Sequence, residues 1–272
     1  MCNKIAIYLA AALCIGCTAS IPADPPADAC RLFLAGCISS ADTRHSVQIR
    51  YSYQDRTEPA TDVVLKCFVN GSEKAWSREW FTYSFDADLK PGDTVRLEAH
   101  SSSAGTASVE ITVPEKPVCG NDWKKRGGYV DLYPWIQDSP ETEDYYRIEV
   151  NPQEIDLSRD PLLSASAGEK TSYNSMRYYV MDNGTSFSDA CFSGRRQDFV
   201  IGLVNKPVPG SIIKVRISRI ERSEYIHGSI LLLERYLTTD HDYYGFQMLP
   251  ENISGGMGLV TAVASEDFKI EL

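Results

Sequence analysis

Alternation of apolar and polar residues dominates the chain from Arg31 onward. The stretches Val47–Tyr53 and Val63–Val69 each place an apolar residue at every second position, which predicts strands with one buried face. The second stretch leads into Asn70-Gly71, a pair that tolerates the positive φ angles of a tight hairpin turn. We therefore expect a returning strand through Trp76 to Phe85.

The same texture continues beyond a turn at Pro91-Gly92-Asp93, through Val95–Ala99 and Val109–Val113. About six or seven short strands separated by polar turns are typical of an immunoglobulin-like β-sandwich. We assign this first domain to residues 30–116, up to a proline-bearing joint.

A second β-rich domain is expected over residues 117–272, where tyrosines are frequent and strands are indicated at Tyr146–Val150 and Ile212–Ile217. Gln153–Ser175 is expected to form a long excursion. One amphipathic helix is predicted near residues 223–238 and should pack on the sheet of this domain. Its apolar residues recur at spacings of four, three and four: Ile226, Ile230, Leu233 and Leu237. The fold class is therefore mainly β.

The N-terminus has the layout of an export signal. Lys4 precedes the uncharged run Ile5–Gly16, which is shorter than the about 20 residues of a spanning helix. A small residue stands directly before Cys17, as lipoprotein signal peptidase requires. We predict a lipoprotein signal peptide at residues 1–16, a lipid on Cys17 and a Pro-rich tether at residues 17–29.

One residue departs from the usual lipoprotein signal and leaves a second type of export signal open. Cys14 occupies the position three residues before Cys17 where lipoprotein signals usually carry leucine. The alternative is an ordinary secretory signal cut near Ala19, which would release the body from the membrane.

The net charge and the cysteines restrict the possible partners and the possible disulfides only slightly. A net charge of −10 spread along the chain disfavours nucleic acid as a partner. Five cysteines remain after the anchor, an odd number with no Cys-x-x-Cys spacing. They are Cys30, Cys37, Cys67, Cys119 and Cys191. Their pairing is left open, with a buried free thiol expected for Cys67, which alternates in phase with Leu65 and Val69.

Candidate chemistry is sparse. The chain has neither a Gly-x-Ser-x-Gly nor a His-Glu-x-x-His motif. Asp240-His241-Asp242 is interpreted as a solvated helix exit, and Glu141, Glu143 and Asp144 as a solvated turn before a strand. Gly255-Gly256-Met257-Gly258 predicts a turn or bulge before the penultimate strand, Leu259–Ala264. The histidines occur singly, at His45, His100, His227 and His241. We predict no catalytic residue, no metal ligand and no cofactor.

Three short motifs carry a family resemblance. They are Phe187-Ser188-Asp189 with Phe192 and Gly194, then Ser223-Glu224-Tyr225, then Asn252 to Gly258. In these residues the chain resembles the Bacteroidetes lipoproteins grouped as domain of unknown function 4249. The resemblance implies a lipoprotein signal, a sandwich-like N-terminal region and a β-rich C-terminal region. It also implies an accessory role beside TonB-dependent outer-membrane receptors, and it supplies no catalytic residue.

The sequence therefore favours a non-enzymatic, lipid-anchored outer-membrane protein that serves as a binding or accessory subunit in TonB-dependent nutrient uptake. Whether it lies on the cell-surface or the periplasmic face is left open, as are its ligand and its oligomeric state. The first alternative is a cell-surface adhesin or a surface-structure assembly component. The second is a hydrolase whose site is assembled from distant residues.

Overall fold

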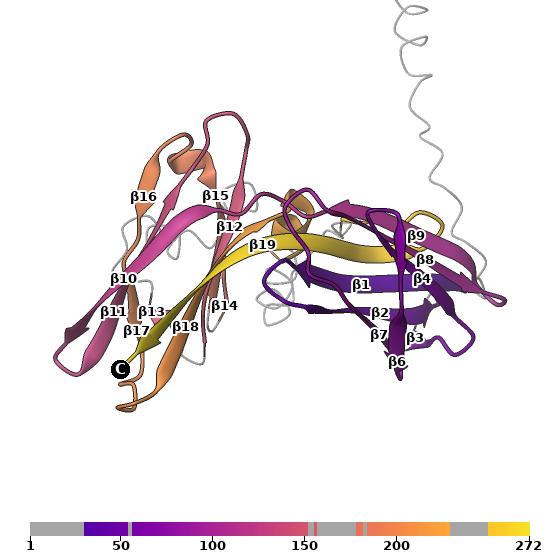
Figure 1. The fold of residues 1–272 in the computed structure, drawn as a ribbon, viewed down its shortest axis with the longest axis horizontal. Helices are drawn as coiled ribbons and strands as arrows, with labels where there is room; N and C mark the ends of the chain where they lie inside the picture. Colours follow the sequence, from indigo (N-terminus) through magenta and orange to yellow (C-terminus); the bar gives the residue numbers. More distant parts are fainter. Residues whose placement is uncertain (1–29, 54–55, 152–154, 157–177, 182–183, 229–249) are drawn as a thin grey trace, which may run out of the picture.

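The computed structural model describes residues 30–53, 56–151, 155–156, 178–181, 184–228 and 250–272. Over these residues the chain is mainly β and forms two β-sandwiches (Figure 1), so the predicted fold class is confirmed. The predicted signal peptide, the tether and Cys17 lie outside the described residues.

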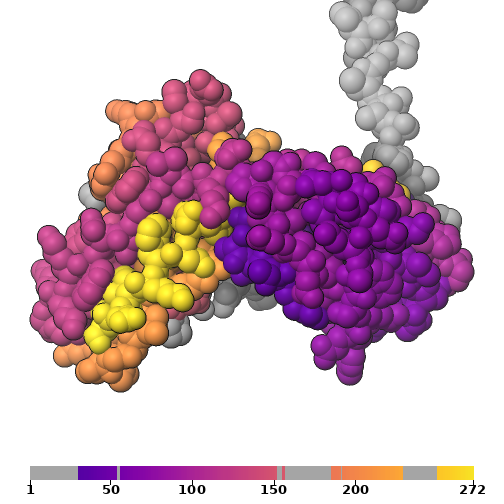
Figure 2. All heavy atoms as spheres, viewed as in Figure 1, coloured from indigo at the N-terminus to yellow at the C-terminus, as the bar shows by residue number. Residues whose placement is uncertain are grey.

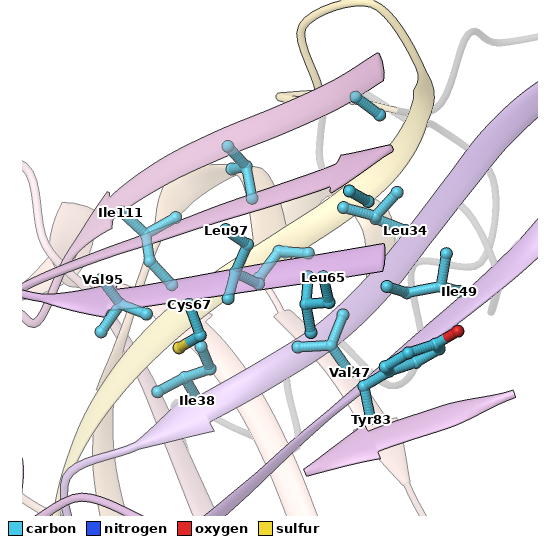
Figure 3. Close-up of a cluster of buried hydrophobic side chains, with 14 of the residues drawn as sticks. Leu34, Ile38, Val47, Ile49, Leu65, Cys67, Tyr83, Val95, Leu97 and Ile111 are labelled. Carbon is cyan, nitrogen blue, oxygen red and sulfur yellow. The ribbon is translucent and has the colours of Figure 1, made fainter. Parts of the chain in front are cut away.

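The first sandwich packs a layer built mainly from the first two strands of the chain against a four-stranded layer. The first layer contains β1 (Arg31–Ser39), β2 (Arg44–Ser52), β3 (Thr57–Pro59), β6 (Trp76–Glu79) and β7 (Thr82–Asp86). The second contains β4 (Val64–Val69), β5 (Ser72–Lys74), β8 (Thr94–Ser101) and β9 (Gly105–Thr112). Alternate residues of both layers meet in one core (Figure 3). Leu65, Cys67 and Leu97 lie in that core, as the alternation predicts.

The hairpin at Asn70-Gly71 forms, with φ of 50° and 76° at these residues. The strand that returns along β4 is β5, however, and residues 76–85 form a separate hairpin of β6 and β7 that turns at Trp80, where φ is 57°. β5 pairs with β4, and after Ala75 the chain changes layers to form β6, which pairs with β7. This change of layer at Ala75 places β5 at the edge of the four-stranded layer and β6 at the edge of the other layer.

The second sandwich also has two layers. One contains β10 (Val118–Arg126), β11 (Tyr129–Gln137), β13 (Ile155–Asp156), β16 (Arg196–Asp198) and β17 (Ile201–Leu203). The other contains β12 (Tyr145–Asn151), β14 (Tyr178–Met181), β15 (Gly184–Ser188) and β18 (Ile212–Ile220). A 3-10 turn, Asp189–Cys191, follows β15. The core of the second sandwich contains four aromatic rings whose neighbouring centroids lie 5.0 to 6.2 Å apart: Tyr146, Phe187, Phe192 and Phe199.

One strand belongs to both sandwiches. β19 (Met257–Glu271) is 15 residues long, and its first half pairs in parallel with β1 while its second half pairs antiparallel with β18. The two main layers thereby join into one ten-stranded sheet. Figure 2 shows the residues of β19 in yellow between the indigo lobe and the magenta and orange lobe.

Several expectations about the C-terminal region change with this arrangement. Residues 117–272 were expected to form the second domain, but residues 257–263 pair within the first sandwich. The strand after the glycines is the last strand of the chain rather than the penultimate one, because it continues through residue 271 without a break. A helix begins at Arg222 and is described to residue 228. Ile230, Leu233 and Leu237 lie outside the described residues. No helix in the described ranges is long and apolar enough to cross a membrane.

Candidate functional site

The start of helix 222–228 is fastened to the middle of the shared strand. Glu221 accepts a hydrogen bond from the backbone N–H of Ala262 (3.0 Å), and Glu224 accepts one from the Thr261 hydroxyl (2.9 Å). Residues three apart lie on the same side of a helix, so both carboxylates reach β19 together. Burial raises the pKa of Glu221, against the lowering effect of that backbone hydrogen bond.

Glu224 is the centre of a polar cluster at the junction of the two sandwiches. Its Oε1 lies 2.6 Å from the Arg147 guanidinium, and the two side chains are only 12% and 15% exposed. Arg147 also donates from Nε to the Ser186 hydroxyl at 3.1 Å. The cluster therefore joins the helix start to β12, β15 and β19. Beside it, the rings of Tyr145 and Tyr225 lie 4.9 Å apart.

Cys37 of β1 completes this cluster. Its thiol lies 3.7 Å from Oε2 of Glu224. Although part of the residue is open to solvent, burial of the thiol and the adjacent carboxylate raise the pKa of Cys37 to about 12. A thiol with such a pKa is almost entirely protonated at neutral pH, and the protonated form is a poor nucleophile. The junction therefore does not activate this cysteine.

The described residues line two cavities, one beside the junction and one in the second sandwich. The first has a volume of about 290 Å³ and lies on the outer side of β1 and β19, where Phe33, Glu224, His227 and Thr261 line it. The second has a volume of about 540 Å³ and lies beside β11, β13 and β17 in the second sandwich. Its lining includes Asp131 and Asp156, each of which already interacts with other residues.

The glycine-rich motif before β19 is explained by close packing. Asn252 donates to the Val260 carbonyl at 2.6 Å and accepts from the Val260 N–H at 3.1 Å. These two hydrogen bonds hold the segment before β19 against the strand. Gly255 and Gly258 have φ of 73° and 107°. A Cβ at Gly258 would overlap the Leu34 carbonyl oxygen. The predicted backbone role of these glycines is confirmed, and close approach to β1 adds a second reason for them.

The motif around Asp189 is part of a buried acidic cluster. Asp138 accepts from the Tyr146 hydroxyl (2.6 Å) and from the backbone N–H of Gly194 (2.8 Å). Asp189 donates its backbone N–H to the Asp144 carbonyl at 2.9 Å. Burial raises the pKa of the Asp189 carboxyl, and the neighbouring Asp138 and Asp144 carboxylates raise it further. These acids hold the turn after β15 in place.

Asp144 corrects one sequence-based interpretation. Glu141 and Glu143 are exposed, as a solvated turn requires, but Asp144 is only 5% exposed. Its carboxylate pairs with the guanidinium of Arg219 on β18. The burial of Asp144 was not predictable because this partner lies 75 positions further along the chain.

Among the cysteines and histidines named from the sequence, Cys37 and His227 line the first cavity together with Glu224. Cys30, Cys37, Cys67 and Cys119 are free, and burial raises the pKa of Cys67 to about 12. His45 is buried beside the Ala87 carbonyl at 3.0 Å, whereas His100 lies near Thr106. Asp240-His241-Asp242 lies outside the described residues, as does the proposed lipid site. Cys67 is thus confirmed as a buried free thiol.

Within the residues that the structure describes, no group of three or more His, Cys, Asp or Glu side chains is placed to hold a metal ion. The junction residues Arg147 and Glu221 were not named from the sequence, and Cys37 was named only as one of five cysteines of open pairing. The spacing of Glu221 and Glu224 and the polar position of Arg147 on a mixed strand face were the available signals.

The chain is distantly similar to several solved structures. A solved structure, described as the complete manganese lipoxygenase of Gaeumannomyces graminis and a partial zonadhesin of Komagataella pastoris, is 10% identical, with a TM-score of 0.28, over 70% of this chain and 88% of that one. The collagen adhesin of S. aureus is 7% identical, with a TM-score of 0.26, over 90% and 97%. A titin fragment, I67–I69, is 13% identical, with a TM-score of 0.21, over 69% and 58%.

No curated protein matched the chain. The family model of domain of unknown function 4249 matches residues 18–268, a range that includes all three motifs described above. The chain therefore belongs to the domain of unknown function 4249 family.

Proposed function

We propose that the chain is a lipid-anchored outer-membrane protein that acts as a non-enzymatic binding or accessory subunit of a TonB-dependent nutrient uptake system. The observation that carries the proposal is the strand shared by the two sandwiches. A hydrogen-bonded connection of this kind holds the two sandwiches at a fixed angle, which suits a protein that docks on a larger receptor.

The roles of the family motifs support a binding protein rather than a catalyst. Glu224 is neutralised by Arg147, and Asp138 accepts from Tyr146 and Gly194. These polar residues are used in the protein's own contacts. Their arrangement is accounted for by the need to fix the junction and the turn after β15.

The direct test is a pull-down from solubilised outer membrane of the native host, using the full chain with an affinity tag at its C-terminus. We expect a TonB-dependent receptor to copurify with the chain during growth on at least one nutrient. The Cys17→Ser variant is the matched control and should recover less receptor, because it cannot be lipidated. Recovery of no transporter under any nutrient condition would contradict the proposed role.

A further inference from the structure

Exposed apolar side chains gather at one end of the second sandwich. Five of the nine large hydrophobic side chains that are exposed in the described ranges lie there: Trp123, Tyr129, Val204, Val208 and Ile212. The first two flank the turn between β10 and β11, and the others lie between the end of β17 and the start of β18. In Figure 1 this end is at the lower left, near the C-terminus.

These two segments form one surface. The ammonium of Lys206 lies 5.3 Å from the centre of the Tyr129 ring, and a Cβ at Gly128 would lie 3.7 Å from the Lys206 side chain. The backbone N–H of Gly210 donates to the carbonyl of the terminal Leu272 at 2.7 Å. We call residues 123–129 and 204–212 the distal end.

The charge of the distal end is opposite to that of the whole chain. Its two segments contain Lys124, Lys125, Arg126 and Lys206 and no acidic residue, in a chain of net charge −10. Alternation along β10 directs Lys124 and Arg126 to one face and Lys125 to the other, so cations surround the hairpin turn. Acids do lie nearby: Asp122 precedes the first segment, Asp131 pairs in register with Lys124, and Glu271 pairs with Ile212. Asp131 and Asp156 also line the second cavity, beside Arg126 and Tyr129.

We propose that the distal end is a membrane-contact surface that binds anionic lipid headgroups. Tryptophan and tyrosine favour the bilayer interface, and lysine and arginine are attracted to anionic headgroups. Valines at the same end supply apolar surface that can enter the headgroup boundary. Arg126 and Tyr129 form the last pair before the hairpin turn at Gly127-Gly128. This contact goes beyond the proposed function and does not depend on the lipid at Cys17.

Vesicle sedimentation tests the proposal with the full chain carrying Cys17→Ser. The vesicles are phosphatidylcholine alone or phosphatidylcholine with phosphatidylglycerol. We expect the chain to prefer the anionic vesicles, with binding that weakens as salt is added. The triple variant Lys124→Gln, Lys125→Gln, Arg126→Gln should bind anionic vesicles roughly a hundredfold more weakly.

The matched control removes three exposed cations from the first sandwich: Arg31→Gln, Lys66→Gln and Lys90→Gln. It carries the same net charge and the same N-terminal segment as the triple variant, and it should retain the affinity of the parent. Trp123→Ala leaves the charge unchanged and should also weaken binding.

Equal affinities of the triple variant and the control would overturn the proposal, as would equal binding to the two kinds of vesicle. Capture of an acidic protein in place of anionic vesicles would also overturn it. The proposed function fails on a different result, the absence of a receptor in the pull-down, so the two failures are distinguishable.

Discussion

A side chain at position 258 would overlap the carbonyl oxygen of Leu34, because Gly258 pairs with Leu34 where β1 and β19 run in parallel. The φ of 107° at Gly258 adds backbone strain for any other residue. We predict that Gly258→Ala lowers the free energy of unfolding by about 3 kcal/mol or more, since strain and overlap act together. Urea denaturation measures the loss.

Gly210 provides the control for this prediction. Its φ is 80°, but a Cβ there would meet no atom within 4 Å. Gly210→Ala should therefore cost only the strain of the left-handed backbone, about 1–2 kcal/mol. Losses of the same size at both positions would mean that the approach to β1 does not matter.

The ion pair between Glu224 and Arg147 should contribute to stability in proportion to its burial. Glu224→Ala leaves the Arg147 guanidinium, 15% exposed, without this carboxylate. We expect a loss of about 3 kcal/mol in the free energy of unfolding. At the exposed pair of Arg56 and Glu58, where the side chains are 53% and 48% exposed, Glu58→Ala should cost less than about 1 kcal/mol. A comparable loss from both variants would be inconsistent with a tightly held junction.

The same carboxylate should control the reactivity of Cys37. Burial is the main cause of its raised pKa and Glu224 the second, so Glu224→Gln should lower that pKa and speed alkylation at mildly alkaline pH. Iodoacetamide labelling followed by mass spectrometry gives the rate at each cysteine. Cys67, which lies in the core of the first sandwich, is the internal control and should react no faster. An unchanged rate at Cys37 would show that the contact with Glu224 is not maintained in solution.

Asp267 should give part of the stability a dependence on pH. Burial alone would raise its pKa, but hydrogen bonds from Arg216 (2.8 Å) and Lys214 (2.6 Å) outweigh that effect and lower it. A carboxyl with a lowered folded-state pKa stabilises the fold above its unfolded pKa, and the stabilisation is lost as pH falls through the folded-state value. Asp267→Asn should cost about 1–2 kcal/mol at neutral pH.

The difference between the parent and Asp267→Asn should shrink as the pH falls below about 4, the usual range for an aspartate. Unfolding free energies measured across that range provide the check. A difference that stays constant with pH would indicate that the loss comes from packing and not from the charge.

Local pattern was sufficient for the strands and for the faces that they bury. The alternation through Leu65 and Cys67 predicted which side chains enter the core, and Asn70-Gly71 predicted a hairpin that forms. The local pattern did not predict which distant segments would pair with each other. Nothing near Met257 indicates that the strand it begins will pair with Phe33, because that choice depends on contacts that form only in the folded chain.

The junction shows the same limit for polar residues. Arg147 could be recognised as the polar residue of a mixed strand face, but its partner Glu224 lies on a distant helix. A carboxylate beside a turn is most often solvated, and for this reason the burial of Asp144 against Arg219 could not be foreseen. Buried charged residues need an opposite charge, as Asp144 has in Arg219, or hydrogen-bond donors, as Asp138 has in Tyr146 and Gly194. The sequence does not reveal which of these partners will meet.

The position of β19 also has a consequence for the order in which the protein is made. A chain is synthesised from its N-terminus, and domains usually fold as they emerge. Here Val260 and Ala262 belong to the core of the first sandwich, although they are made long after β1. The N-terminal sandwich cannot complete its sheet until β19 has been made, so a chain terminated before β19 would leave β1 unpaired on one side and open to aggregation.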